Sequence, residues 1–334
     1  MFSSLCMAST AAGPPFISSA IKKTTIPADV KVFDRRVKCA QRDRAAKASD
    51  FDTLRYLKDE FGERLADRVF DLTGFNDVCL DLGCGGGHLA PFLIRENVGI
   101  FIQCDISLAM VKRSRGSLKD EFPVLRVHSD EELVTFRDES IDLIMSSLAA
   151  HWINDLPNWF TRCLRVLRPD GCFIGSMFSG ETLYQLRVAL QLAEMERLGG
   201  LGAHISPFVE AIDVGALMSC AGFTTITLDI DEIEVGYPNI FALMYDLQGM
   251  AESNASVRRT ANLRREILLA ADAIYRSLYA SEDGRYPATF QVVSFIGWRP
   301  GPKMPKPAKR GSQNVSFQNL SEVIEKQSDY IPNK

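Results

Sequence analysis

The clearest prediction of the fold comes from the stretch Val78-Cys79-Leu80-Asp81-Leu82-Gly83-Cys84-Gly85-Gly86-Gly87. Its first residues have strand character and lead into an acid and a glycine-rich turn, and Leu89, Phe92 and Leu93 follow at helical spacing. This order predicts a strand, a loop and a helix. A loop with few side chains lets a ligand lie against backbone amides and against the N-terminus of a helix. The alternative is an ordinary turn that binds nothing.

A second acid, Asp105, ends the next expected strand, Ile100-Phe101-Ile102-Gln103-Cys104-Asp105. In a strand–helix–strand unit this position lies beside the glycine loop, where a carboxylate can accept hydrogen bonds from both hydroxyls of a ribose. The structural alternative is a solvated acid at a strand end. The spacing from Asp81 favours the ribose.

The glycine pattern separates two classes of cofactor. A dinucleotide-binding loop reads G-x-G-x-x-G, but His88 stands at the third glycine position here. Asp81 lies just before Gly83, where an acid suits the α-amino group of an amino-acid-like ligand. In this pattern the chain resembles the class I S-adenosylmethionine (SAM) methyltransferases. The resemblance implies SAM as cofactor, with Asp130 on the adenine amino group and with the other cofactor-binding residues being Asp81, Gly83, Cys84, Gly85, Asp105, Ile106 and Ser147.

Strand and helix patterns alternate along the rest of the chain. Further strands are expected over 124–127, 140–147, 172–178, 224–235 and 288–298. Helices are expected over 51–72, 108–111, 156–168, 181–197, 209–221, 240–250 and 257–279. Such alternation predicts a parallel sheet covered on both faces. We therefore expect an α/β, class I SAM methyltransferase-like (Rossmann-type) fold with a mostly parallel seven-stranded sheet and an antiparallel last strand.

Composition limits the function and suggests a location. The chain has 334 residues, 46% of them hydrophobic, and a net charge of −4, which argues against a general nucleic-acid binder. Residues 1–28 contain no acid but five serines, three threonines and two lysines, and bases outnumber acids up to Lys47. This favours a mitochondrial transit peptide over 1–30, with a disordered N-terminus as the alternative. The expected parts after it are a helical segment at 31–76, a methyltransferase-like domain at 77–300 and a mobile tail at 301–334.

Histidines supply the candidates for chemistry. His151 follows the fourth strand at the sheet edge where open α/β sheets bind ligands, so it is the candidate catalytic residue, as a base or an orienting donor. The alternative is a histidine that holds its loop together. His128 and Asp130, with His204, have the residue types of a non-haem iron site, but they fall where adenine is expected, so we predict no metal. The segment 204–208 is either part of a lid over the substrate or a turn before the next helix.

From about Phe33 to Phe317 the chain is similar to one branch of this superfamily. This branch is the mitochondrial arginine-hydroxylases that act as assembly factors of respiratory complex I. The resemblance rests on the segments 32–35, 65–69, 81–85, 151–157, 204–208, 246–250, 307–312 and 315–317.

This resemblance implies hydroxylation of an arginine on a core iron–sulfur subunit of NADH:ubiquinone oxidoreductase. It places the protein in the mitochondrial matrix, with a peripheral contact to the inner membrane through the assembly intermediate. Two alternatives stay open. One is a SAM-dependent methyltransferase acting on a small carboxylate or an acyl-carrier thioester. The other is a non-catalytic assembly chaperone with a methyltransferase fold.

Overall fold

The computed structural model describes residues 31–118, 121–260, 262–304 and 310–312. The expected transit peptide over 1–30 and most of the expected tail lie outside the described residues. The helices and strands belong to a compact unit that begins at Val32.

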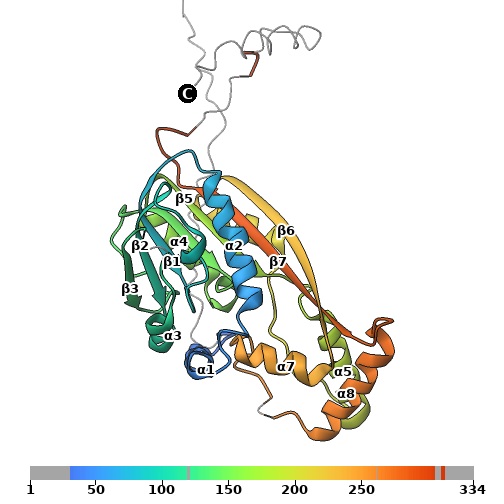
Figure 1. Cartoon of the computed structure of the whole chain (residues 1–334). Helices are drawn as coiled ribbons and strands as arrows, with labels where there is room; N and C mark the ends of the chain where they lie inside the picture. The colour runs from blue at the N-terminus through green and yellow to red at the C-terminus, as the bar shows by residue number, and fades with distance from the viewer. Residues whose placement is uncertain (1–30, 119–120, 261, 305–309, 313–334) are drawn as a thin grey trace, which may run out of the picture. The chain divides into compact units, whose positions relative to one another are not determined.

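One sheet of seven strands has the order β3-β2-β1-β4-β5-β7-β6. The strands are β1 (Asn76–Leu82), β2 (Val98–Asp105), β3 (Val124–His128), β4 (Ile141–Ser147), β5 (Leu167–Phe178), β6 (Thr224–Tyr237) and β7 (Tyr286–Trp298). The strands β1 to β5 pair in parallel, and β7 lies antiparallel to both β5 and β6 (Figure 1). The predicted fold class, including the antiparallel last strand, is confirmed.

Eight α-helices accompany the sheet within the described residues. They are α1 (Arg35–Lys47), α2 (Tyr56–Phe70), α3 (Leu108–Arg113), α4 (Leu156–Val166), α5 (Tyr184–Leu198), α6 (Ala211–Ala221), α7 (Ile240–Gly249) and α8 (Arg265–Tyr279). Local chemistry fixes several ends. Asp34 and Asp155 accept backbone N–H groups at the starts of α1 and α4. Gly199 and Gly222 end α5 and α6 in the left-handed conformation.

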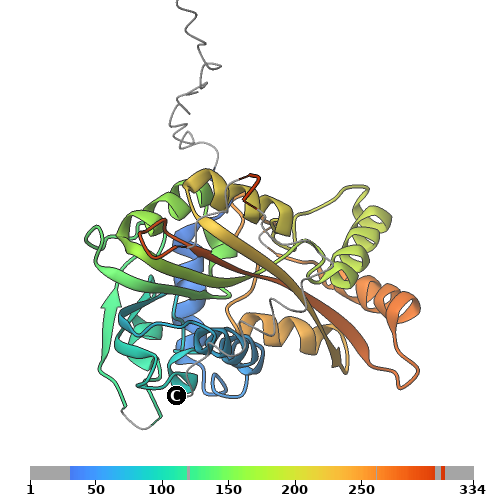
Figure 2. The same cartoon turned by 90° about the horizontal axis from the view of Figure 1, so that it is seen from above.

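The central strands bury side chains on both faces. Cys79 and Leu143 pack with Leu65 of α2 on one face. The neighbouring residues Leu80 and Ile144 point the other way and pack with residues of α4 and α6. In Figures 1 and 2 the blue helix α2 and the green helix α4 lie on opposite faces of the sheet. In a third core, α5, α7 and α8 pack against the end of β6 and the beginning of β7. The helix α1 lies near the carboxyl ends of the parallel strands (Figure 1).

Three helix predictions were wrong in part. No α-helix follows the glycine loop: 83–97, described in full, holds only the 3-10 helix η2 (Ala90–Phe92), and Leu93 is already extended. The apolar spacing there reflects burial of Leu89 and Leu93 in the core. The helix expected up to 168 ends at Val166, because the chain enters β5 and Arg168 pairs with Asp142.

The helix expected from residue 257 begins only at Arg265. The preceding segment is held in another way, since Ser256 bridges Phe33 and Val257 N–H donates to the carbonyl of Val32. None of the described helices has the length and apolar character to cross a membrane.

Candidate cofactor and active site

Buried polar atoms without a hydrogen-bond partner gather at the carboxyl ends of β1, β4 and β5. Among the described residues they include both carboxylate oxygens of Asp81, the hydroxyls of Ser147 and Ser176, and Nδ1 of His151. Ser147 and Ser176 are register partners, and His151 lies in the 3-10 helix η3 (Ala150–Trp152) that follows β4. Buried polar groups normally find partners. This cluster therefore lies at the edge of the sheet where a ligand is expected, and a ligand could supply the missing partners.

Asp81 is the acid at the centre of this cluster. Its side chain is buried, and burial raises its pKa well above the ordinary value, with the nearby Asp105 adding to the effect. A buried carboxylate without a partner is costly unless a cation or a proton accompanies it. A ligand α-amino group meets that need, which fits the role expected for Asp81.

The glycine loop bends through left-handed backbone. Gly83, Gly85 and Gly87 have φ of 79°, 51° and 74°. A Cβ on Gly83 would lie 2.3 Å from that of Ala149. The loop amides are already used, because those of Gly83 and Cys84 both donate to the carbonyl of Cys104. The free polar groups of the site are therefore side chains, not the loop amides that the sequence suggested.

Asp105 is fully buried, so the alternative of a solvated acid at the strand end is wrong. One carboxylate oxygen accepts the Gly85 N–H at 3.0 Å and an Arg42 guanidinium N–H at 3.0 Å. The other accepts the Ser107 N–H at 2.7 Å. Burial raises the pKa of Asp105, and Arg42 opposes that rise. A carboxylate accepts about four hydrogen bonds, so both hydroxyls of a ribose can bind here only if one of these three donors leaves. Arg42 is the only side chain among the three.

The expected adenine region is closed by arginines from α1. Arg42 also donates to Glu131 at 2.8 Å. Arg35 pairs with Asp130 at 2.7 Å and with Glu131 at 2.8 Å. The N–H of Ile106 donates to Glu131 at 3.1 Å. Asp130 and Ile106 thus lie together as expected, but Glu131 and the two arginines occupy the space between them.

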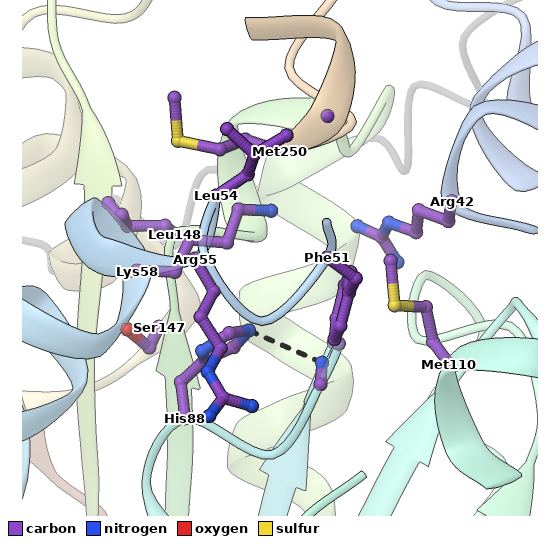
Figure 3. Close-up of a pocket in the computed structure, with 14 residues that line it drawn as sticks. Arg42, Phe51, Leu54, Arg55, Lys58, His88, Met110, Ser147, Leu148 and Met250 are labelled. Carbon is purple, nitrogen blue, oxygen red and sulfur yellow. Dashed lines mark hydrogen bonds between the residues drawn. The ribbon is translucent and has the colours of Figure 1, made fainter. Parts of the chain in front are cut away.

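The cavity beside the glycine loop is narrow. It holds about 20 Å³, and Figure 3 shows Arg42 on the side opposite Lys58 and Ser147. Pockets for drug-sized ligands usually measure about 300–1,000 Å³. The residues present fit SAM in their chemistry, through Asp81 and the glycine turn. Room for it requires that Arg42 and Phe51, which lines the same cavity, move back.

His151 belongs to a buried ionic cluster. Its Nε2 lies 3.1 Å from Glu252, which also accepts from Trp152 at 3.0 Å and pairs with Lys58 at 2.7 Å. Burial opposes ionisation of Glu252, but Lys58 and His151 outweigh it and hold its pKa far below the ordinary value. Burial lowers the pKa of His151. A neutral His151 that donates from Nε2 keeps Nδ1 as an acceptor without a donor.

Sequence reasoning missed Glu131, Glu252 and the buried face of α1. Arg35, Lys38 and Arg42 follow one another at three and four residues, which places them on one helix face. Lys38 donates to the carbonyl of Ala251 at 2.8 Å, and its Nζ lies 3.2 Å from the ring centroid of Trp152. The spacing of these three residues could have predicted a basic helix face. Part of the basic run before Lys47 therefore serves the site.

The residues considered for iron are engaged separately. Nε2 of His128 lies 3.0 Å from the carbonyl of Ile106, Asp130 pairs with Arg35, and His204 pairs with Glu194. In the part of the chain that the structure describes, no three His, Cys, Asp or Glu side chains form a metal-binding group.

Acid should loosen the Glu131 cluster. Burial alone raises the pKa of Glu131, but Arg42 and Arg35 outweigh it and lower the pKa from 4.5 to about 2. Because the folded pKa is the lower one, Glu131 stabilises the fold above pH 4.5 and loses this contribution as the pH falls toward 2. We expect the melting temperature of the wild type to fall across this window, and Glu131→Gln to lack that part of the loss. Thermal denaturation at a series of pH values checks this. An equal fall in melting temperature toward pH 2 in the wild type and in Glu131→Gln would contradict it.

Comparisons with known proteins agree with this architecture. A family model described as a methyltransferase domain matches residues 80–175. "Arginine-hydroxylase NDUFAF5, mitochondrial" of Homo sapiens is 47% identical over 300 residues, which cover 90% of this chain and 86% of that protein. The protein of the same name in Dictyostelium discoideum is 36% identical over 87% of this chain and 70% of its own length. Malonyl-[acyl-carrier protein] O-methyltransferase of Halorhodospira halophila is 33% identical over 82% of this chain and 91% of its own length.

The sheet order, the glycine loop flanked by acids and the methyltransferase-domain match define a class I SAM methyltransferase-like protein, and they support SAM as its cofactor. Within this class, the chain belongs to the family of the mitochondrial arginine-hydroxylase NDUFAF5.

Proposed function

We propose that this chain is a SAM-binding arginine hydroxylase of the mitochondrial matrix that assists the assembly of respiratory complex I. The observation that carries the proposal is 47% identity over 90% of the chain to relatives named arginine-hydroxylases in human, mouse and zebrafish. The substrate we propose is an arginine on a core iron–sulfur subunit, reached on the matrix side of the inner membrane.

The chain's own residues divide the work at the sheet edge. SAM, when bound, supplies a positively charged sulfonium centre beside the glycine loop. Asp81 would hold its amino group, Asp105 its ribose, and Asp130 with Ile106 its adenine; Gly83, Cys84, Gly85 and Ser147 shape the floor. The helical segment at 31–76 covers this site from outside the methyltransferase-like domain at 77–300, through side chains such as Arg42 and Phe51. We assign His151 to the substrate side, as the acceptor that Glu252 orients.

A second candidate is methyl transfer to a small carboxylate or an acyl-carrier thioester. It is favoured by the relatives named malonyl-[acyl-carrier protein] O-methyltransferases, which are 31% and 33% identical over 84% and 82% of this chain. The two reactions leave different products, because hydroxylation adds one oxygen atom and methylation adds one methylene unit.

Mass spectrometry of the iron–sulfur subunits separates these functions. The subunits are purified from cells with and without this protein, and their arginine-containing peptides are compared. We expect a gain of one oxygen atom on an arginine only when the protein is present. A gain of one methylene unit would favour methyl transfer. Unchanged peptides together with failed assembly would favour the non-catalytic chaperone.

A further inference from the structure

A second and larger cavity lies next to the cofactor site. It measures about 270 Å³ and is bounded by α5, by 203–206 and Phe208, by α7, and by 252–254, 259–260 and Leu263. Most of its wall is aliphatic, with side chains that include Leu183, Leu186, Leu190, Met244, Leu247 and Leu263. This volume suits one long side chain and is small for a whole nucleoside cofactor.

The carboxylate of Glu252 forms part of this wall. A carboxylate can accept about four hydrogen bonds, and Glu252 has three donors, from His151, Trp152 and Lys58. Nδ1 of His151 has no donor at all. Glu252 can therefore accept about one further hydrogen bond at this cavity, and His151 acts through Glu252 without being part of the wall. Arg259 also lines the cavity, but it donates to the carbonyl of Ser256 and lies 3.8 Å from Asp34. A ligand that brings N–H donors would share the Glu252 carboxylate with Lys58.

The two cavities share a boundary. Lys58 lines the narrow cavity beside the glycine loop and pairs with Glu252 of the larger one at 2.7 Å. The chain at the end of α7 passes between them, because Met250 lines the first cavity while Glu252 and Ser253 line the second. A side chain bound in the larger cavity would therefore end next to the cofactor.

Four residues of the segment 204–208 line the larger cavity. His204 pairs with Glu194 of α5, and the Ser206 hydroxyl donates to Asn254 at 3.2 Å. The ring of Phe208 lies 6.0 Å from that of His151. Residues of this segment line the cavity, and its role as part of a lid over the substrate stays a prediction.

We propose that the larger cavity binds the side chain of the substrate arginine, with Glu252 accepting the guanidinium group. The aliphatic wall suits the methylene stem of arginine, and a buried carboxylate suits its charged, planar donor group. This inference rests on the proposed function for the identity of the substrate, but it assigns a binding site that can be measured without turnover.

Two variants test the site with a defined probe. The probe is N-acetyl-L-arginine methylamide, and the matched neutral probe carries citrulline in place of arginine. We expect the wild type to bind the arginine probe at least tenfold more tightly than the citrulline probe. Glu252→Gln should lose at least tenfold because it removes the charge, and Met244→Trp should lose at least tenfold because it fills the cavity. Glu196→Gln, an exposed change on α5, should bind as the wild type does.

Folding and SAM binding are followed in the same proteins. Met244 is only partly buried and does not line the cofactor cavity, so Met244→Trp should keep its circular dichroism and its SAM-dependent melting shift. The inference is overturned if the wild type binds neither probe, or if both cavity variants bind the arginine probe as the wild type does.

Failure of the site and failure of the function give different results. Each variant, Met244→Trp or Glu252→Gln, is expressed alone in cells that lack the wild type. If the substrate arginine still gains oxygen in both cases, this cavity is not the substrate site, but the proposed function is unaffected. Selective binding of the arginine probe by a protein that never adds oxygen to arginine would keep the cavity and remove the hydroxylase function.

Discussion

Gly85→Val is expected to abolish SAM binding and to leave the fold of the free protein intact. Gly85 has φ of 51°, and its Cβ would meet only the His88 ring, at 3.4 Å, within the protein. The added branch would instead project into the ligand space at the glycine turn. A β-branched residue in left-handed backbone also costs about 1–3 kcal/mol, which a protein of this size can absorb locally.

The melting shift caused by SAM measures this effect. A ligand at a hundred times its Kd stabilises the folded state by about 2.7 kcal/mol, so the wild type should show a clear rise in melting temperature and Gly85→Val none. Gly200→Val is the control, because a Cβ on Gly200 meets nothing within 4 Å. A wild-type shift in Gly85→Val would show that this loop does not hold the cofactor.

Arg42→Ala is expected to tighten SAM binding about tenfold, which is about 1.4 kcal/mol. In the free protein the Arg42 guanidinium forms ion pairs with Asp105 at 3.0 Å and with Glu131 at 2.8 Å. These carboxylates lie where the ribose and adenine are expected. Hydrogen bonds to charged groups contribute about 1.5–3 kcal/mol each, so a ligand must replace them before it binds. Removing the guanidinium removes that competition.

Calorimetry on four proteins tests this competition. Asp105→Ala removes the ribose acceptor itself and should weaken SAM binding by about 1–3 kcal/mol, roughly five- to more than a hundredfold. Arg44→Ala removes an exposed arginine from the same helix and should match the wild type. Weaker binding by Arg42→Ala would mean that Arg42 contacts the cofactor instead of competing with it. Equal binding by Asp105→Ala and the wild type would exclude Asp105 from the cofactor site.

The sheet was predictable because its strands are buried on both faces. Residues of β4 such as Leu143 and Ile144 enter opposite cores, so the strand reads as one apolar run. The turn was predictable as well, because its left-handed positions need glycine. The helix after the turn was not, because Leu89 and Leu93 have helical spacing but meet the core from irregular backbone.

The partners of the site acids were not predictable from local sequence. Arg42 and Asp105 are 63 residues apart, and His151 and Glu252 are 101 residues apart. No pattern within one element links such positions, since the fold alone brings α1 and the end of α7 to the edge of the sheet. The basic face of α1 could be predicted from the spacing of its residues, but the acids that it contacts could not.

The proposed function joins SAM binding at one edge of this sheet to arginine hydroxylation. Its most direct test is the mass of the arginine-containing peptides of the iron–sulfur subunits from cells that lack the protein and express either the wild type or Gly85→Val at equal levels. We predict that the wild type restores a gain of one oxygen atom on an arginine and that Gly85→Val leaves the peptide unmodified. A full gain of oxygen with Gly85→Val, or a gain of one methylene unit with the wild type, would contradict the proposed function.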